Sequence, residues 1–192
     1  MSQAPHAAPL TYRDPLDGVQ VALGVSGSIA AYKSLSLASA LTQAGARVDT
    51  LLTPAAARFV SALAFGALTH GPVVQSLWEA GSEMGMDHVA IAERAELLFI
   101  APATADLLAR LALGLADDAL TTTALACTAP LVIAPAMEPR MWAHAAVQGH
   151  VRTLTERGAT FVGPMEGRMA SGLRGRGRMA EPSDLVEHAR LV

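Results

Sequence analysis

The sequence predicts an α/β fold: a single domain in which one parallel sheet is covered by helices on both faces. Short apolar runs alternate with helical patterns along the chain, and such alternation favours parallel strands joined by right-handed crossovers. The 192 residues suit one domain with a sizeable core. Polar and proline turns follow three of the apolar runs. Because ligands bind at the carboxyl ends of parallel strands, these turns are the candidate site.

The first strand and the turn after it give the clearest local signal. Residues 19–25 form a predicted strand that ends in Ser26, Gly27 and Ser28, and a helix of small residues begins at Ile29. Such a loop presents unpaired N–H groups at the positive end of a helix dipole, which suits a phosphate. The third glycine of the dinucleotide fingerprint is missing. By itself the pattern is equally typical of an N-cap turn.

The remaining elements follow in order. Further strands are predicted at residues 46–52, 96–101, 131–134 and 160–162, and helices at 35–44, 54–59, 61–68, 88–95, 120–127 and 145–157, with others beginning at Leu107 and Pro182. Glycines make residues 78–87 a predicted loop. The domain spans residues 18–192, after a flexible N-terminal arm at 1–17. Glycines and arginines at 163–179 predict a mobile loop over the substrate.

Composition narrows the possible partners. A formal net charge of −3 gives no reason to expect nucleic acid. The single cysteine, Cys127, excludes an intrachain disulfide and fits a reducing, cytoplasmic location. No apolar stretch reaches the length of a membrane span, and the scattered histidines lack the spacing of metal ligands. A hydrophobic content of 52% predicts a homo-oligomer with apolar interfaces.

Five ordered segments resemble one known family: GVSGSIAAYK, MDHVAIAERAELLFIAPATA, GLADDALTT, IAPAMEPRMW and MASGLRGRGRMAEP. Over about residues 18–182 the chain resembles the homo-oligomeric flavin-containing cysteine decarboxylases, which include phosphopantothenoylcysteine and peptidyl-cysteine decarboxylases. The resemblance implies a Rossmann-like, flavodoxin-like domain and FMN bound between subunits of a trimer, which can associate into a dodecamer. It also implies oxidation of a cysteine thiol to a thioaldehyde, followed by loss of carbon dioxide.

The resemblance also implies roles by position. His88 matches the catalytic histidine, a residue whose pKa near neutrality suits a base; the alternative is a solvated histidine at a helix N-terminus. Glu138 is placed among both the catalytic and the substrate-binding residues. The expected FMN contacts are Ser26, Gly27, Ser28, Thr53, Pro102, Ala103, Thr104, Ala105 and Asp106. The expected substrate contacts are Met137, Glu138, Arg140, Met141, Trp142 and Ser171.

Glu138 departs from the family pattern, which has an asparagine that contacts the substrate carboxylate. An ionised Glu138 would repel that carboxylate. Four interpretations follow: burial keeps Glu138 protonated, Arg140 offsets its charge, the substrate presents a different group, or Glu138 is only a helix cap. Asp106 also replaces an asparagine, on the cofactor turn. This change is tolerable because aspartate and asparagine both cap helices.

Ser171 stands where the coenzyme A enzymes carry a cysteine that helps to return the enethiol to a saturated thiol. A hydroxyl is a far weaker acid than a thiol and donates a proton poorly. The peptidyl enzymes lack this cysteine and release an aminoenethiol, so Ser171 favours that branch or is small loop filler. Arg174, Arg176 and Arg178 are candidates to clamp a carboxylate or phosphate, or they only solvate the loop.

The leading hypothesis is FMN-dependent oxidative decarboxylation of the C-terminal cysteine of a ribosomally made peptide, giving an aminoenethiol. The first alternative is a phosphopantothenoylcysteine decarboxylase of coenzyme A biosynthesis. The second is an FMN-binding regulatory subunit without catalysis, which the departures at Glu138 and Asp106 allow.

Overall fold

A six-stranded parallel sheet runs through the molecule in the computed structural model, which describes residues 13–78 and 87–192. Its strand order is β3-β2-β1-β4-β5-β6. The strands are β1 Gln20–Val25, β2 Arg47–Leu52, β3 Val73–Val74, β4 Leu97–Ala103, β5 Leu131–Pro135 and β6 Thr160–Phe161. The chain moves outward from β1 to β3, then returns to the other side of β1. The carboxyl ends of β1 and β4 are therefore a topological switch point, where such sheets bind ligands.

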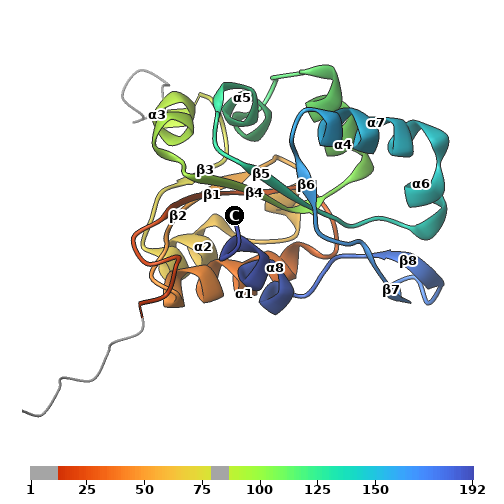
Figure 1. Ribbon diagram of the computed structural model, residues 1–192, viewed down its shortest axis with the longest axis horizontal. Helices are drawn as coiled ribbons and strands as arrows, with labels where there is room; N and C mark the ends of the chain where they lie inside the picture. Colours follow the sequence, from red (N-terminus) through yellow and green to blue (C-terminus); the bar gives the residue numbers. More distant parts are fainter. Residues whose placement is uncertain (1–12, 79–86) are drawn as a thin grey trace, which may run out of the picture.

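Helices cover both faces of the sheet, which confirms the predicted fold class (Figure 1). On one face lie α1 Ala31–Gln43, α2 Ala62–Thr69 and α8 Pro182–Ala189, and on the other α3 Asp87–Arg94, α4 Ala105–Leu113, α5 Ala119–Ala126 and α7 Ala145–Glu156. The short α6, Pro139–Ala143, follows β5. Among the described residues, no helix combines the length and apolar character of a bilayer span.

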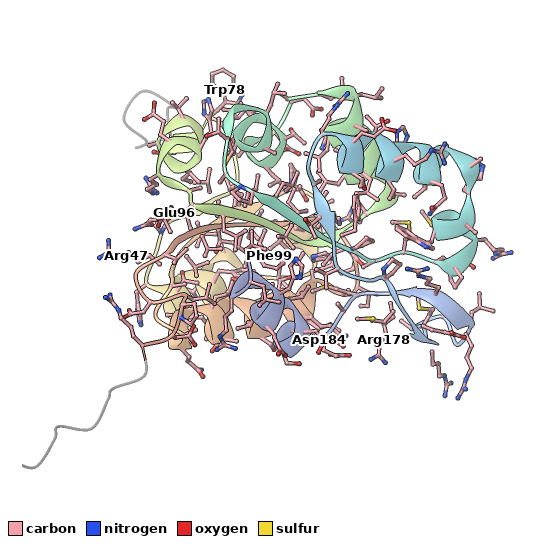
Figure 2. The ribbon with its side chains drawn as sticks, in the orientation of Figure 1. Arg47, Trp78, Glu96, Phe99, Arg178 and Asp184 are labelled. Carbon is pink, nitrogen blue, oxygen red and sulfur yellow. The ribbon has the colours of Figure 1, made fainter. Side chains whose placement is uncertain are left out.

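Successive side chains of the central strands point to opposite faces of the sheet and belong to two separate hydrophobic cores. Leu23 and Phe99 belong to the core under α1, α2 and α8, while Leu98 and Ile100 belong to the core under α3, α4, α5 and α7. Figure 2 shows Phe99 in the middle of the sheet. Gly24 brings β1 and α5 together, because a Cβ on Gly24 would lie 2.3 Å from Leu120 Cδ1. This close approach explains a glycine inside a buried strand.

The expectation of a loop at residues 163–179 is corrected by the structure. Strand β7, Met165–Arg168, pairs antiparallel with β8, Arg174–Arg178. The glycines let this ribbon lie directly on the segment after β5: a Cβ on Gly177 would be 2.2 Å from the Met137 carbonyl oxygen, and the Met137 N–H donates to the Gly177 oxygen at 3.0 Å. Glycine here permits close packing of two backbones.

Smaller differences concern element boundaries. Residues 54–59 contain only the 3₁₀ turn η1, Ala56–Arg58, in place of the predicted helix. Pro102 and Ala103 are the buried end of β4 and not a turn. Strand β3 and helix α6 were not predicted, because two to five residues are too short for a periodic pattern. The predicted loop at 78–87 and the arm at 1–17 lie largely outside the described residues.

An ion pair links α1 to the start of α8, two helices that lie on the same face of the sheet. The buried Lys33 of α1 donates through Nζ to Glu181 Oε1 at 2.9 Å and to the Met179 carbonyl at 3.3 Å. Arg178 Nη2 donates to the same carboxylate at 2.5 Å, and Figure 2 shows Arg178 close to α8. The Lys33 hydrogen bond, with lesser help from Arg178, holds the pKa of Glu181 below its ordinary value.

We expect Glu181→Gln to reduce the free energy of unfolding at pH 7 by about 1 kcal/mol, because the partly exposed pair loses a charged hydrogen bond to a buried ammonium. Since the pKa of Glu181 is lower in the folded state, its contribution exists above the ordinary glutamate pKa and is lost as pH falls through the folded value. In urea denaturation, wild type and variant should therefore converge below about pH 4.

The matched control is Glu187→Gln, which changes an exposed residue of the same helix that has no ion pair within the described chain. Its unfolding free energy should match wild type within about 0.5 kcal/mol. A loss in Glu181→Gln that stays constant from pH 7 to pH 3 would contradict the ionic origin of the effect.

Candidate functional site

Two neighbouring cavities open at the carboxyl edge of the sheet. The first, of about 760 Å³, lies between the ends of β1, β2 and β4, and the second, of about 530 Å³, lies between the start of α1, the segment after β5 and the β7–β8 ribbon. The loop after β1 borders both, since Ser26 and Gly27 line the first cavity and Ser28 lines the second. A ligand held by this loop can therefore extend into either cavity.

The loop after β1 is built to receive an anion. Ser26 Oγ donates to the Pro102 carbonyl at 2.8 Å and accepts from the Thr104 N–H at 3.1 Å, which fixes it against the end of β4. A Cβ on Gly27 would lie 2.4 Å from Ala55 Cβ. Helix α1 has neither an acidic residue in its first turn nor a side-chain cap. In the described chain the N–H groups of Gly27 and Ile29 lack hydrogen-bond partners. These features fit a phosphate.

The other expected cofactor residues divide by position. Thr53, Thr104, Ala105 and Asp106 line the first cavity with Ser26 and Gly27. Thr104 also caps α4 by accepting from the Leu107 N–H at 3.3 Å. Pro102 and Ala103 are buried in β4 and line neither cavity. They act on the site only through the Pro102 carbonyl that orients Ser26.

An arginine that the sequence analysis did not single out forms part of the first cavity's wall. Arg110 Nη1 donates to Asp118 Oδ2 at 2.7 Å, and its Nη2 donates to Asp117. The Asp117 hydrogen bond raises the pKa of Arg110, and the same bond lowers the pKa of Asp117. Asp118 in turn caps α5, which ties the wall to the helix. The acidic pair before a helix was visible in the sequence, but its arginine partner was not.

Glu138 caps α6 at the wall of the second cavity. Its carboxylate accepts from the backbone N–H groups of Arg140 at 2.9 Å and Met141 at 3.3 Å, and from Arg140 Nε at 2.9 Å. Desolvation acts to raise the pKa of Glu138, but the bonds and charge of Arg140 outweigh it and hold this pKa below its ordinary value. These contacts favour the ionised carboxylate over the protonated one, and the helix-cap and Arg140 interpretations both describe them.

The expected substrate residues are only partly brought together. Met137, Glu138 and Ser171 line the second cavity, whereas Met141 lines the first. Arg140 and Trp142 line neither, and Trp142 instead stacks under the guanidinium of Arg176, 6.0 Å from the ring centre. The second cavity is also lined by three charged residues that were not predicted from the sequence: Lys33, Arg168 and Glu181. No spacing rule connects residues so far apart in sequence.

His88 lies away from both cavities. It is the second residue of α3, and Figure 1 shows α3 and the β7–β8 ribbon at opposite ends of the molecule. Its Nδ1 is buried without a hydrogen-bond partner in the described part of the chain. Among those same residues, no group of three or more His, Cys, Asp or Glu side chains could hold a metal ion.

A parallel α/β domain with an anion cradle at its switch point defines a flavodoxin-like nucleotide-binding class. The chain belongs to the Flavoprotein family, which it matches over residues 9–190.

Sequence comparison finds relatives of this chain among proteins of coenzyme A biosynthesis. The coenzyme A biosynthesis bifunctional proteins CoaBC of Vibrio cholerae and Bacillus subtilis are each 44% identical to the chain, over 90% and 91% of its length. The chain spans 43% of each of these proteins.

Solved structures with the same fold include two decarboxylases. A PPC decarboxylase mutant complexed with pantothenoylaminoethenethiol aligns with a TM-score of 0.78 and 34% identity, covering 91% of this chain and 97% of that one. The FMN-dependent cysteine decarboxylase SpaF aligns with a TM-score of 0.77 and 33% identity, covering 92% and 97%. These relatives confirm the expected family of flavin-containing cysteine decarboxylases, the enzyme class and the FMN cofactor.

We expect Gly27→Ala to weaken FMN binding at least about tenfold, because the new methyl group collides with Ala55 inside the cradle. The measurement is the FMN content and flavin affinity of purified protein, with far-ultraviolet circular dichroism as a check on folding. Gly149→Ala is the control, since its Cβ would approach only Arg152 Nη2, at 3.8 Å. A folded Gly27→Ala protein with wild-type FMN affinity would remove this loop from the cofactor site.

Proposed function

We propose that the chain decarboxylates the cysteine of phosphopantothenoylcysteine with FMN, as the alternative from coenzyme A biosynthesis states. The observation that carries the proposal is the pair of adjoining cavities, one with an anion cradle and one walled by Met137, Glu138 and Ser171. The 44% identity to the matching part of CoaBC favours this substrate over the peptide of the leading hypothesis.

The residues of the two cavities have distinct tasks in this proposal. Ser26, Gly27 and Ser28 hold the FMN phosphate, and Thr53, Thr104, Ala105 and Asp106 border the cofactor. Bound flavin supplies an acceptor for the two electrons that the cysteine thiol gives up as it becomes a thioaldehyde. The carboxylate then leaves as carbon dioxide, and its bonding electrons enter the new carbon–carbon double bond of an enethiol.

The substrate carboxylate meets a charge-neutral pair and not a lone glutamate. Arg140 is bonded to Glu138 through both its backbone and its Nε, so the glutamate charge is offset where the substrate approaches. The arginine side chain is largely exposed and has further N–H groups to donate. Arg140 lines neither cavity, so in this proposal it acts from outside the cavity lining and compensates for the loss of the asparagine that the family resemblance assigns to the carboxylate.

His88 completes the site from a second copy of the chain. Its place on α3, remote from the second cavity of its own chain, supports a site shared between protomers (Figure 1). Trp78 is 88% exposed at the end of the molecule that carries α3 (Figure 2), and Leu63 is 81% exposed. Exposed apolar side chains that gather in one contiguous patch are typical of a surface covered by a partner. The oligomer is a trimer, with dodecamers as a further assembly.

We expect His88→Asn to keep its FMN and its oligomeric state but to lose turnover by at least about a hundredfold, because a positioned general base contributes that much. Flavin absorbance and size-exclusion chromatography report the first two properties, and carbon dioxide release reports the third. His144→Asn is the control, because His144 is exposed at the start of α7 and lines neither cavity. Undiminished activity in His88→Asn would exclude His88 from the mechanism.

Ser171 determines which product leaves. It lines the second cavity at the turn of the ribbon, where the resemblance places a cysteine. The PPC decarboxylase structure that retains pantothenoylaminoethenethiol is a mutant with serine in place of a cysteine. Ser171 therefore supports release of an aminoenethiol by this chain, a product that differs from the saturated thiol of the coenzyme A enzymes. The carboxylate is then lost as carbon dioxide, two hydrogens pass to the flavin, and an external electron acceptor must reoxidise the flavin before the next turnover. Release of an aminoenethiol is also expected under the peptide hypothesis. Similarity to the SpaF structure supports that hypothesis as the second candidate function.

We expect Ser171→Cys to shift the product toward the saturated thiol, because a thiol can donate the proton that a serine hydroxyl cannot. Mass spectrometry separates the products by the two hydrogens that the aminoenethiol lacks. Ser183→Cys is the control, because Ser183 is exposed on α8 and outside both cavities. An unchanged product in an active Ser171→Cys enzyme would contradict the assignment.

The substrate itself is tested by incubating the flavin-loaded protein with phosphopantothenoylcysteine and with peptides that end in cysteine. Decarboxylation of the first alone supports the proposal, and decarboxylation of a peptide alone restores the leading hypothesis. No reaction with either favours the FMN-binding regulatory subunit.

A further inference from the structure

Two arginines face each other across the β7–β8 ribbon. Arg168 of β7 is the direct cross-strand partner of Arg174 in β8, and the neighbouring pair on the same face is Glu166 with Arg176. Opposed residues of an antiparallel pair have Cα atoms about 5 Å apart and project their side chains to one side. Like charges directly opposite each other in this arrangement destabilise a ribbon. The Arg168–Arg174 pair therefore needs a separate explanation.

The other cations around the second cavity already have partners. Lys33 and Arg178 both donate to Glu181, and Arg140 donates to Glu138. Arg176 donates through Nε to the Pro164 carbonyl at 3.2 Å and stacks on Trp142. By contrast, the side chains of Arg168 and Arg174 make no hydrogen bond or ion pair within the described residues. Two guanidinium groups are thus left for an anion from outside the chain.

The arginine pair is held in a fixed place beside the cavity. Below the ribbon, a Cβ on Gly175 would lie 2.8 Å from Pro139 Cγ, and one on Gly177 would lie 2.2 Å from the Met137 carbonyl oxygen. The Met169 N–H donates to the Leu173 carbonyl at 2.8 Å and closes the turn between the strands. A backbone packed so closely keeps the Cα atoms of Arg168 and Arg174 at a constant separation, which favours recognition of one compact group by their side chains.

Arg168 links this pair to the second cavity, which Arg174 itself does not line. Arg168 lines the cavity together with Met137, Glu138 and Ser171. The cavity volume of about 530 Å³ suits an extended small molecule. A substrate whose cysteine lies at Glu138 and Ser171 can therefore present its other end to the arginine pair.

We propose that Arg168 and Arg174 together bind a phosphate monoester at the end of the substrate remote from its cysteine. This inference rests on the proposed function and adds the group that selects the substrate. A phosphate monoester carries nearly two negative charges and three acceptor oxygens, so it can accept from both guanidinium forks at once. A single carboxylate, as on an acidic peptide, has fewer oxygens and one charge, and it matches the pair less well.

The double variant Arg168→Gln/Arg174→Gln tests the inference by comparing substrates with and without the phosphate. We expect the KM for phosphopantothenoylcysteine to rise at least about tenfold with kcat nearly unchanged, because charged hydrogen bonds remote from the chemistry are lost. The KM for pantothenoylcysteine, which lacks the phosphate, should stay within about twofold of wild type.

The control is Arg47→Gln/Arg152→Gln, which removes the same charge from exposed positions on β2 and α7. Figure 2 shows Arg47 and Arg178 at opposite ends of the molecule. Both KM values should remain at wild-type level in this control. A similar rise in the control would show a general effect of net charge and would overturn the proposal.

A binding measurement separates this inference from the proposed function. Calorimetric titration of the FMN-loaded protein with 4′-phosphopantothenate, which has no cysteine to react, should show binding that the Arg168→Gln/Arg174→Gln variant loses. If 4′-phosphopantothenate binds in this way but phosphopantothenoylcysteine is not decarboxylated, the proposed function is wrong and the phosphate site is still supported. Equal KM values for the phosphorylated and unphosphorylated substrates in wild type would overturn the phosphate site and keep the function. A KM that rises only for an acidic peptide would also overturn it.

Discussion

The hydroxyl of Ser26 joins the two halves of the sheet at the point where the strand order reverses. It donates to the Pro102 carbonyl and accepts from the Thr104 N–H, so the turns after β1 and β4 have a fixed relation. The cradle for an anion, the start of α1 and the cap of α4 all follow from that relation. Without it, the loop that carries the N–H groups of Gly27 and Ile29 would lose its side-chain link to the end of β4.

Electrostatics then divides the carboxyl edge into regions with different tasks. Carboxylates and cations in the cavity walls are mostly paired with each other, as in Arg110 with Asp117 and Asp118, or Glu138 with Arg140. Pairing fixes the side chains and leaves little net charge at the walls. In the proposals above, recognition of phosphate groups falls to groups without partners in the described chain, which are the backbone N–H groups of Gly27 and Ile29 and the side chains of Arg168 and Arg174.

The sequence predicted the sheet, most helices and the turn after β1, because buried parallel strands such as β4 are continuous apolar runs. It did not predict the β7–β8 ribbon, because a segment rich in glycine has low strand propensity. The pairing also depends on the close packing of Gly177 on the backbone of Met137. The Lys33–Glu181 contact joins residues 148 positions apart, beyond any local rule. The pKa of Glu138 likewise depends on a cap geometry that only the fold provides.

The close packing of the β7–β8 ribbon on Met137 and Pro139 also determines which of its residues can be substituted. Gly175 and Gly177 lie so close to Pro139 and Met137 that any larger residue would lift the ribbon off α6. Their neighbours Arg168 and Arg174 are exposed and have no such limit. Variation in natural relatives, or in a designed library, can therefore change the outward face while the glycine face stays constant. If the proposed phosphate site is correct, replacing the outward-facing arginines changes substrate preference without moving the glycine face of the ribbon.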